Sequence, residues 1–451
     1  MFERVFKLSE HKTTVKTEVM AGITTFMTMA YILAVNPSVL GSTGMDTTAV
    51  LLATALASCL GTLCMAFMAN LPFALSAGMG LNAFMAYTVV AGYGYSWQVA
   101  LLAVFIEGLI FIVLSLTNIR EAIFNAIPLT LKKGVSVGIG LFIAFIGLQN
   151  SGLCVDSATL VGIISFPENF HTAGICALLT LIGLFFTAVF YTRKMKGAIL
   201  YGILLTWILG MICQVTGLYV PTPDAGFYSL FPSWGMTDFS RLGLTFGQCF
   251  NVDFSAVGIV NFIVVIFSFL FVDIFDTLGT LIGVCSKAGY VSADGKIRGI
   301  DRALMSDSIG TLCSGLLGCT TATTYLESVS GVAAGGRTGL TAVTVAVLFA
   351  LSLFLAPILS IVPVYATSAA LMIVGAMMMG TLRAINWDDF TDALPAFLTV
   401  ISMPLTFNIA TGLGIGFISY IAVKVLTRRW KDINPTMCVL AVLFGISFAL
   451  R

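Results

Sequence analysis

Two aspartates, Asp273 and Asp276, lie inside an apolar run that begins near residue 256 and continues to about residue 285. A charged side chain at the centre of a bilayer costs about 2.5–3.5 kcal/mol on insertion scales. Residues three apart share one face of a helix, with Cβ atoms about 5–6 Å apart. Two carboxylates that close in a dry site cannot both ionise cheaply, so the pair is suited to taking up a proton. Thr277 lies one turn beyond Asp273 and shares this face.

A third acid, Glu327, lies where a segment rich in Gly, Ser and Thr should turn into helix. We expect its carboxylate to project toward Asp273. Two acceptors at one small cavity suit a ligand with several N–H donors, such as a purine, a pyrimidine or an amide, and suit an anion poorly. Asn82 is the polar counterpart of Glu327 in the first half of the chain. An Asn commonly bonds membrane helices together, but in an interrupted segment a role in a site is favoured.

The other buried acids have plainer interpretations. Asp276 fits a direct role in the site, and it fits equally a bond to the backbone or to Thr277 that holds the helix. Glu107 is expected to bond a neighbouring helix. Asp307 lies about one turn into its span, near Arg302, and is expected to form an interfacial ion pair.

The composition places these acids in a polytopic membrane protein. Of 451 residues, 58% are hydrophobic and 10% charged, and the mean hydropathy is +1.02. A soluble domain carries about 25% charged residues. Basic and acidic residues nearly balance, at 22 and 21, so no nucleic-acid partner is expected. The polar first 16 or so residues lack the apolar core of a cleavable signal peptide. The 10 Cys and 2 His form no CxxC or Cys/His cluster, so neither zinc nor disulfides are expected.

Apolar runs of spanning length set the predicted architecture. They fall at 19–40, 47–69, 97–117, 133–150, 172–191, 196–217, 254–285, 303–318, 338–357, 364–382, 392–407 and 409–427. Two shorter segments, 76–91 and 320–334, are interrupted by small polar residues. With both counted, the chain crosses the membrane about fourteen times. The segment 434–450 is either an extra span or an interfacial helix.

The distribution of basic residues supports this count. Cytoplasmic loops carry an excess of Lys and Arg. With the N-terminus in the cytoplasm and alternating sides, Arg241 alone falls outside. The others fall inside: Arg120, Lys132, Lys133, Arg193, Lys194, Lys196, Lys287, Lys296, Arg298, Arg302, Arg337, Arg383, Arg428, Arg429 and Lys431. Removing either short segment would send later basic clusters outward, so both are predicted to cross the cell membrane.

The chain divides into two similar halves. Each carries an interrupted segment in third position, at 71–90 and at 319–336. Seven crossings is an odd number, so the second half must be inverted relative to the first. Such paired segments point to the midplane site of a transporter, where free backbone groups can hold a polar ligand. Gly78 and Gly80 would let a ligand approach the chain, or would serve tight helix packing.

The predicted divisions are the N-terminus at 1–18, a first repeat at 19–217, an extracellular loop at 218–253, a second repeat at 254–428 and a C-terminal segment at 429–451.

Other functions fit less well. An intramembrane aspartyl protease needs two carboxylates in contact that share a proton, whereas Asp273 and Asp276 point along one helix face. A channel would show rings of like charge or repeated filter carbonyls. An anion transporter of the same two-half plan is harder to separate by architecture, although no Arg or Lys occupies the proposed midplane.

Four stretches give the chain a resemblance over nearly its full length. They are MFERVFKLSEHKTTVKTEVMAGITTFMTMAYILAVNP at the start, SAGMGLNAF at 76–84, FVDIFDTLGTLIG at 271–283 and TTYLESVSGVAAGGRTGLTA at 323–342. In these stretches the chain resembles the nucleobase–cation symporters, in the branch of azaguanine/hypoxanthine–guanine and adenine permeases. The related xanthine and uracil branch differs, with Glu where Asp273 stands, and ranks lower.

The resemblance implies an all-α fold of two inverted seven-segment repeats, divided into core and gate domains. The third and tenth segments would be short strand–helix elements. It also implies proton-coupled uptake of a purine, with no cofactor besides the coupling proton, and a homodimer is one expected assembly. By motif, Asp273 and Glu327 would bind the base, with Asn82 and Gly80 from the third segment.

The details of binding follow as a hypothesis. Backbone groups near 76–80 and 323–326 would pin the base, Thr277, Tyr325 and Leu326 would line the site, and Cys319 and Tyr325 could set the preferred purine. A proton would enter Glu327 or the Asp273/Asp276 pair before the core shifts against the gate domain.

Overall fold

The computed structural model describes residues 2–117, 127–157, 160–222, 227–232, 235–253, 257–288, 290, 299–359 and 361–449. These residues are mainly helical and include nine helices long and apolar enough to cross a membrane. Their bounds lie within a few residues of the predicted spans. The crossing count of fourteen stays a prediction, because further apolar helices are shorter. Arg120, Lys296 and Arg298, which entered the charge prediction, lie outside the described residues.

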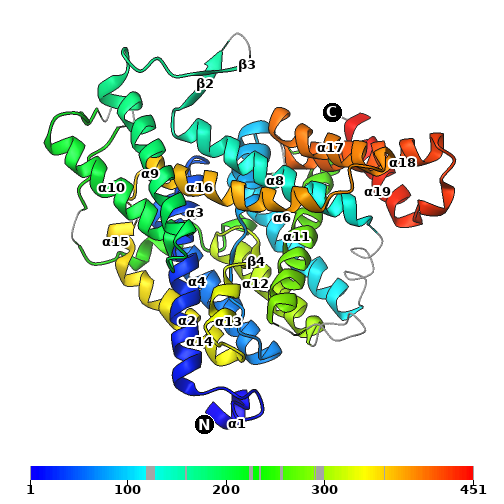
Figure 1. Ribbon diagram of the computed structural model, residues 1–451, viewed down its shortest axis with the longest axis horizontal. Helices are drawn as coiled ribbons and strands as arrows, with labels where there is room; N and C mark the ends of the chain where they lie inside the picture. Colours follow the sequence, from blue (N-terminus) through cyan, green and yellow to red (C-terminus); the bar gives the residue numbers. More distant parts are fainter. Residues whose placement is uncertain are drawn as a thin grey trace.

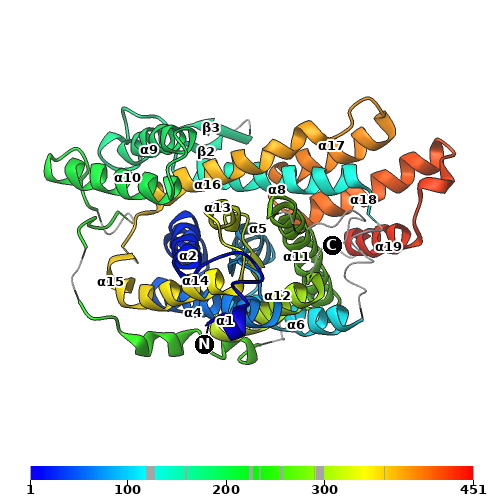
Figure 2. The same cartoon turned by 60° about the horizontal axis from the view of Figure 1, so that its bottom comes forward.

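The helices form two layers, seen edge-on in Figure 2. This arrangement matches the predicted division into core and gate domains, because helices of both halves contribute to each layer. The core layer contains α2 (Val15–Met29), α3 (Ile32–Gly41), α4 (Thr47–Cys64), α6 (Trp97–Leu116), α11 (Ile259–Ala288), α12 (Ile300–Leu317) and α14 (Gly339–Ser352). The gate layer contains α8 (Leu129–Asn150), α9 (Ile175–Thr192), α10 (Ala198–Val215), α16 (Val364–Met378), α17 (Phe390–Leu405) and α18 (Ile409–Leu426).

The interrupted segments are the predicted strand–helix elements. The first comprises β1 (Leu75–Ala77), α5 (Met79–Ala83) and a π-helix at Phe84–Gly92, and the second comprises β4 (Ala322–Thr324) and α13 (Ser328–Ala333). The two strands pair antiparallel with Ser76 opposite Thr323. Figure 1 shows β4 near the middle of the molecule. Backbone polar groups inside a membrane must be satisfied by protein, and here each half of the chain satisfies the other.

The outer edges of the two strands are satisfied by matching threonines. Thr62 of α4 accepts from the Leu75 nitrogen at 3.0 Å and donates to its carbonyl at 3.1 Å. Thr311 of α12 donates to the Ala322 carbonyl at 3.1 Å. Because α4 and α12 hold the same place in their halves, the repeat symmetry extends to the bonds that stabilise the strands.

Small residues bring the core helices close enough to hold this strand pair. A Cβ atom on Gly108 of α6 would lie 2.7 Å from the backbone nitrogen of Leu312, and one on Gly315 of α12 would lie 2.8 Å from that of Phe105. Such contacts are the usual means by which membrane helices approach one another. Helices α6 and α12 therefore pack as reciprocal partners.

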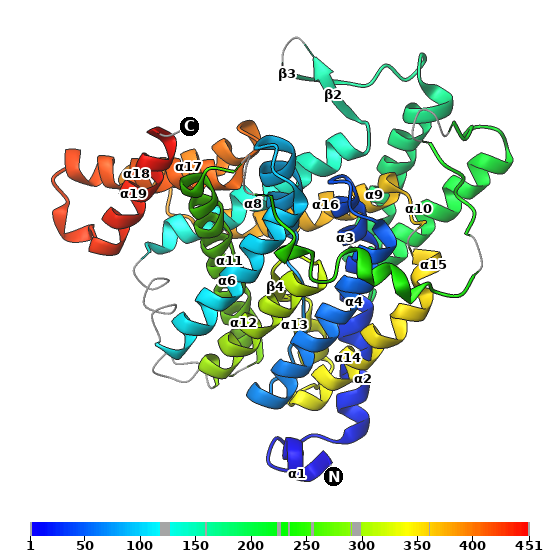
Figure 3. The same ribbon diagram turned by 180° about the vertical axis from the view of Figure 1, so that it is seen from behind.

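Four further elements lie at the periphery of the described chain. A hairpin of β2 (Cys154–Ser157) and β3 (Leu160–Ile163), which the sequence analysis did not predict, projects beyond the gate layer (Figure 3). A short helix, α1 (Phe2–Phe6), begins the chain, and α15 (Ala356–Leu359) follows α14. The C-terminal segment forms α19 (Pro435–Ala449), which packs on α18 through Phe444 and Phe417, with ring centroids 5.7 Å apart.

Candidate functional site

Glu327 lies at the N-cap of α13, directly after β4. This position follows from the chain leaving the strand pair and re-forming helix at the centre of the molecule. The Tyr31 hydroxyl donates a hydrogen bond to Glu327 Oε1 at 2.7 Å. Glu327 is partly buried, whereas Tyr31 is 1% exposed. A carboxylate at the end of a strand and held by a phenol is a ready acceptor for an N–H donor.

The two α11 aspartates have different surroundings. Asp276 is half-buried, hydrogen-bonds the Thr323 hydroxyl of β4 and lies within electrostatic reach of Glu327. Asp273 is fully buried, and its Oδ1 accepts a bond from Thr277 Oγ1 at 2.7 Å. The two acids beside β4 that are only partly buried are therefore Asp276 and Glu327, whereas Asp273, on the same face of α11 as Asp276, is fully buried.

Asp307 of α12 joins Asp273 through Thr277. The Thr277 hydroxyl lies 3.2 Å from both carboxylate oxygens of Asp307. The predicted interfacial ion pair between Asp307 and Arg302 is wrong, because Asp307 is 0% exposed while Arg302 is exposed. Asp307 lies about one and a half turns along α12 from Arg302 and faces the core. Contacts between helices decide this orientation.

The residues before β4 form a buried polar network with four other elements, α3, α4, α5 and α6. Asn36 Nδ2 donates to Thr54 Oγ1 at 2.7 Å and lies 3.3 Å from Cys319 Sγ. Thr320 donates to Asn82 Oδ1, and Thr321 donates to Glu107 Oε2 at 2.7 Å. Glu107 was expected to bond a neighbouring helix, and it instead accepts from the non-helical residue Thr321 before β4. Cys319 is fully buried in this network.

Asn82 retains one donor within this network. It is 1% exposed, and its Nδ2 has no hydrogen-bond partner among the residues that the structure describes. Buried polar groups rarely remain unsatisfied without a reason such as a water or a ligand. Asn82 therefore offers a donor beside the strand pair, as its position in the first interrupted segment suggested.

The remaining predicted residues line the strand pair in different ways. Gly80 packs against the gate layer, where a Cβ atom would lie 2.9 Å from Ile139 Cγ2. The Tyr325 hydroxyl donates to the Ala77 carbonyl at 2.5 Å and ties the two segments together. Leu326 is 44% exposed beside the half-buried Glu327. Gly80 thus permits a close approach of core to gate, which is the packing alternative of the sequence analysis.

Three members of the site were missed by sequence reasoning. They are Tyr31, Thr323 and Asn36, all of which carry neutral polar groups in apolar or Thr-rich stretches. A tyrosine or threonine in a membrane segment carries no strong signal, because it is common there as a helix contact. The one available hint was the polar sequence of the stretch 319–324 as a whole.

A cavity of about 780 Å³ lies between the layers at one end of the molecule. Its lining includes Ser38 of α3, Tyr87, Asn150 of α8 and Tyr365 of α16, with Asn150 donating to the Tyr87 hydroxyl at 2.7 Å. Asp276 and Glu327 are not among its lining residues. The cavity reaches Ala34, one helical turn from Tyr31.

The site as a whole consists of carboxylates, hydroxyls and amides on two strand–helix elements that meet between two layers. Discontinuous segments at the midplane, contributed by both halves, are the binding geometry of secondary transporters. The fold agrees with solved transporters. The transmembrane domain of a cyanobacterium bicarbonate transporter, BicA, is 17% identical with a TM-score of 0.61, covering 89% of this chain and 96% of that one. The solute carrier SLC26A9 is 13% identical with a TM-score of 0.60, covering 92% of this chain and 67% of that one. At these identities the likeness shows a shared fold.

Residues 16–415 match the model of the Permease family. The chain belongs to this family. A putative permease of Methanocaldococcus jannaschii is 48% identical, covering 99% of this chain and 98% of its own. The adenine permease AdeQ of Escherichia coli is 42% identical, covering 99% and 96%. The guanine/hypoxanthine permease PbuG of Bacillus subtilis is 44% identical, covering 98% of each chain. The resemblance to the branch of adenine and guanine/hypoxanthine permeases is confirmed. The protein is therefore a multi-pass membrane transporter and not an enzyme.

Proposed function

We propose that the protein takes up purine nucleobases across the cell membrane, coupled to protons, by alternating access. The observation that carries this proposal is the pair of partly buried acids, Asp276 and Glu327, beside an antiparallel strand pair built from both halves. Carboxylates accept from N–H groups, and purine edges present several of them. Relatives named as adenine and guanine/hypoxanthine permeases support the same substrate class.

In this proposal the base lies between α11 and the start of α13. Glu327 and Asp276 accept its N–H groups, Asn82 supplies a donor, and Asp273 lies behind as the second acid of the helix face. The cavity bounded by Ser38, Asn150 and Tyr365 serves as the outer vestibule. These residues fall at helix ends that the basic residues assign to the outside, with the N-terminus in the cytoplasm.

A proton between the buried acids supports the coupling. The Thr277 hydroxyl has one hydrogen, yet it lies within hydrogen-bond distance of both Asp273 and Asp307. It can donate to one carboxylate only, and a proton on the other carboxyl would satisfy the second contact. We propose that this proton, or one on Glu327, removes a charge that would oppose movement of the loaded core relative to the gate layer.

Uptake assays test the proposal. Vesicles holding the purified protein should accumulate radiolabelled adenine, guanine or hypoxanthine when the outside is acidic, and a protonophore should abolish accumulation. Xanthine and uracil are tested as substrates of the related nucleobase branch, and bicarbonate is tested as an anion substrate. Accumulation of bicarbonate instead of any nucleobase would reject the proposal. Purine accumulation unaffected by the protonophore would reject only the proton coupling.

A further inference from the structure

Tyr31 lies at the junction of α2 and α3, where the first span is interrupted. Its side chain is 1% exposed, and its hydroxyl donates to Glu327 Oε1 at 2.7 Å. A phenol can donate once and can still accept, and a carboxylate has two acceptor oxygens. The contact therefore uses one acceptor position of Glu327, and the carboxylate has further lone pairs that can accept from a ligand.

The neighbours of Tyr31 have other bonding partners. The Tyr325 phenol and the Asp276 carboxylate both lie within electrostatic reach of Tyr31. The Tyr325 hydroxyl donates to the Ala77 carbonyl, and Thr323 bonds Asp276. Both of these hydroxyls are tied to the strand pair, whereas the Tyr31 hydroxyl bonds the acid Glu327 itself.

We propose that Tyr31 is a substrate-reading residue whose hydroxyl passes from Glu327 to an acceptor on the bound base. This inference rests on the proposed function. Adenine presents N6–H beside the acceptor N1, and guanine and hypoxanthine present N1–H beside the acceptor O6. Glu327 takes the N–H and Tyr31 donates to the acceptor next to it. In the absence of substrate the same hydroxyl bonds Glu327, so the carboxylate stays satisfied in both states.

Because the carboxylate and the phenol are adjacent, they recognise an adjacent donor and acceptor as a unit. A base that keeps the N–H but lacks the neighbouring acceptor would leave the Tyr31 hydroxyl unpaired. A site built to hydrogen-bond a substrate group discriminates strongly against an analogue without it. Part of the substrate specificity therefore lies at Tyr31 in the first span, outside the two interrupted segments.

The experiment compares Tyr31→Phe with the wild type by competition against radiolabelled purine uptake. The paired competitors are adenine with 1-deazaadenine, which lacks N1, and hypoxanthine with 6-mercaptopurine, whose sulfur is a weaker acceptor. Tyr31→Phe should weaken adenine and hypoxanthine about tenfold and should leave the two analogues within twofold. The ratio within each pair does not depend on how much protein folds.

Tyr290→Phe is the matched control, because its hydroxyl donates to the Arg337 backbone carbonyl at 2.8 Å and its loss should affect both members of a pair equally. Equal weakening of parent and analogue by Tyr31→Phe would overturn the proposal and make Tyr31 a structural residue. Unchanged affinities for all four competitors would overturn it as well. Absence of purine uptake by the wild type would overturn the proposed function and this inference together.

Discussion

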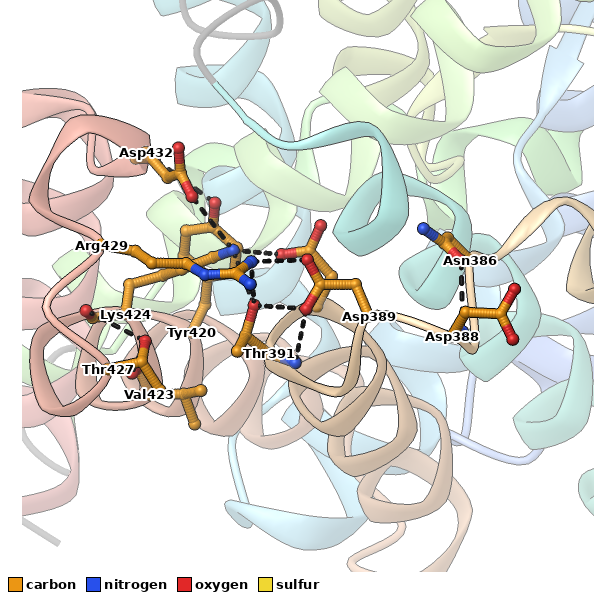
Figure 4. Close-up of polar contacts among 11 residues, drawn as sticks. Asn386, Asp388, Asp389, Thr391, Tyr420, Val423, Lys424, Thr427, Arg429 and Asp432 are labelled. Carbon is orange, nitrogen blue, oxygen red and sulfur yellow. Dashed lines mark hydrogen bonds and ion pairs between the residues drawn. The ribbon is translucent and has the colours of Figure 1, made fainter.

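The acids at the centre of the molecule and those at the ends of α17 and α18 are held by different kinds of partner. In the peripheral cluster, shown in Figure 4, the Lys424 side chain is 3% exposed, and its Nζ lies 2.7 Å from Asp392 and 3.3 Å from Asp432. Arg429 bonds Asp389 at 2.5 Å. At the centre, hydroxyl groups bond the carboxylates of Glu327, Asp273, Asp276 and Asp307 instead.

This difference separates structural acids from acids suited to transport. A base fixes the charge of its partner, so removing that charge leaves a buried cation uncompensated. A hydroxyl can donate to a carboxylate, accept from a carboxylic acid, or turn to a ligand. The central acids can therefore change protonation and partners at small cost, and the peripheral acids cannot. The predictions below test this contrast.

The largest effect is expected for Glu327→Gln, which mimics the protonated acid. It should abolish accumulation of purine against a gradient, because the variant can no longer exchange a proton. Uptake into vesicles with an imposed pH gradient measures this. Asp389→Asn, in the peripheral cluster, is the control and should accumulate purine within about twofold of wild type. Wild-type accumulation by Glu327→Gln would exclude Glu327 as the proton carrier.

Lys424→Met should lower the free energy of unfolding by about 1–3 kcal/mol, because it leaves Asp392, whose side chain is 25% exposed, without its cation. Denaturant unfolding in detergent measures the change. Lys431→Met, at an exposed position three residues beyond Arg428, should have an effect near zero. Purine uptake per folded molecule should stay near the wild-type value. Loss of uptake in a fully folded variant would mean that the peripheral cluster takes part in transport.

Thr277→Val should lower the rate of purine uptake about tenfold, since an isosteric side chain without the hydroxyl leaves two buried carboxylates lacking a shared donor. The pH dependence of uptake should shift as well, because the proton between Asp273 and Asp307 loses its hydroxyl partner. Thr280→Val removes a hydroxyl that bonds backbone carbonyls on the same helix, and should stay within about twofold. Equal effects of the two substitutions would argue against a special role for Thr277.

The smallest effect concerns Asp389, where the Thr391 hydroxyl and the Arg429 guanidinium lower the pKa of the carboxyl to about 2. Its ordinary value is near 4. Because the pKa is depressed in the folded state, the carboxylate contributes stability at neutral pH, and this contribution is lost as pH falls from about 4 through about 2. The melting temperatures of wild type and Asp389→Asn should differ slightly at pH 6 and converge near pH 2. A difference in melting temperature that stays constant from pH 6 to pH 2 would contradict the ion pair between Asp389 and Arg429. Added salt should reduce the difference at pH 6, because the pair is exposed.

Most of the architecture was predictable from local pattern. The spans 47–69 and 409–427 agree with the observed helices to within a residue, since hydropathy is a property of the chain itself. The recurrence of two interrupted segments at equivalent places predicted where the spans break, and the family resemblance implied that these segments are strand–helix elements. The hairpin at 154–163 was missed, since a two-stranded ribbon of four-residue strands has too short a pattern to stand out from a loop.

The candidate site was predicted only in part. The sequence identified Glu327, Asn82 and the two α11 aspartates as polar groups too costly to place in a membrane without purpose. It could not assign Asp307, because an acid one turn into a span can face either the lipid interface or the core. Periodicity placed Asp273, Asp276 and Thr277 on one face. The contacts with Thr323 and Asp307 then gave Asp276 and Asp273 different surroundings.

The sequence by itself determined that this chain crosses a membrane repeatedly, in two related halves, with acids near the middle. Hydropathy, charge distribution and the recurrence of an interrupted segment are all readable along the chain. Only the tertiary structure decided which carboxylate is fully buried, which is shared through Thr277 and which is held by Tyr31. These contacts join residues between 30 and about 300 positions apart. Their partners are neutral hydroxyls, and the role of a hydroxyl depends on which groups the fold places beside it.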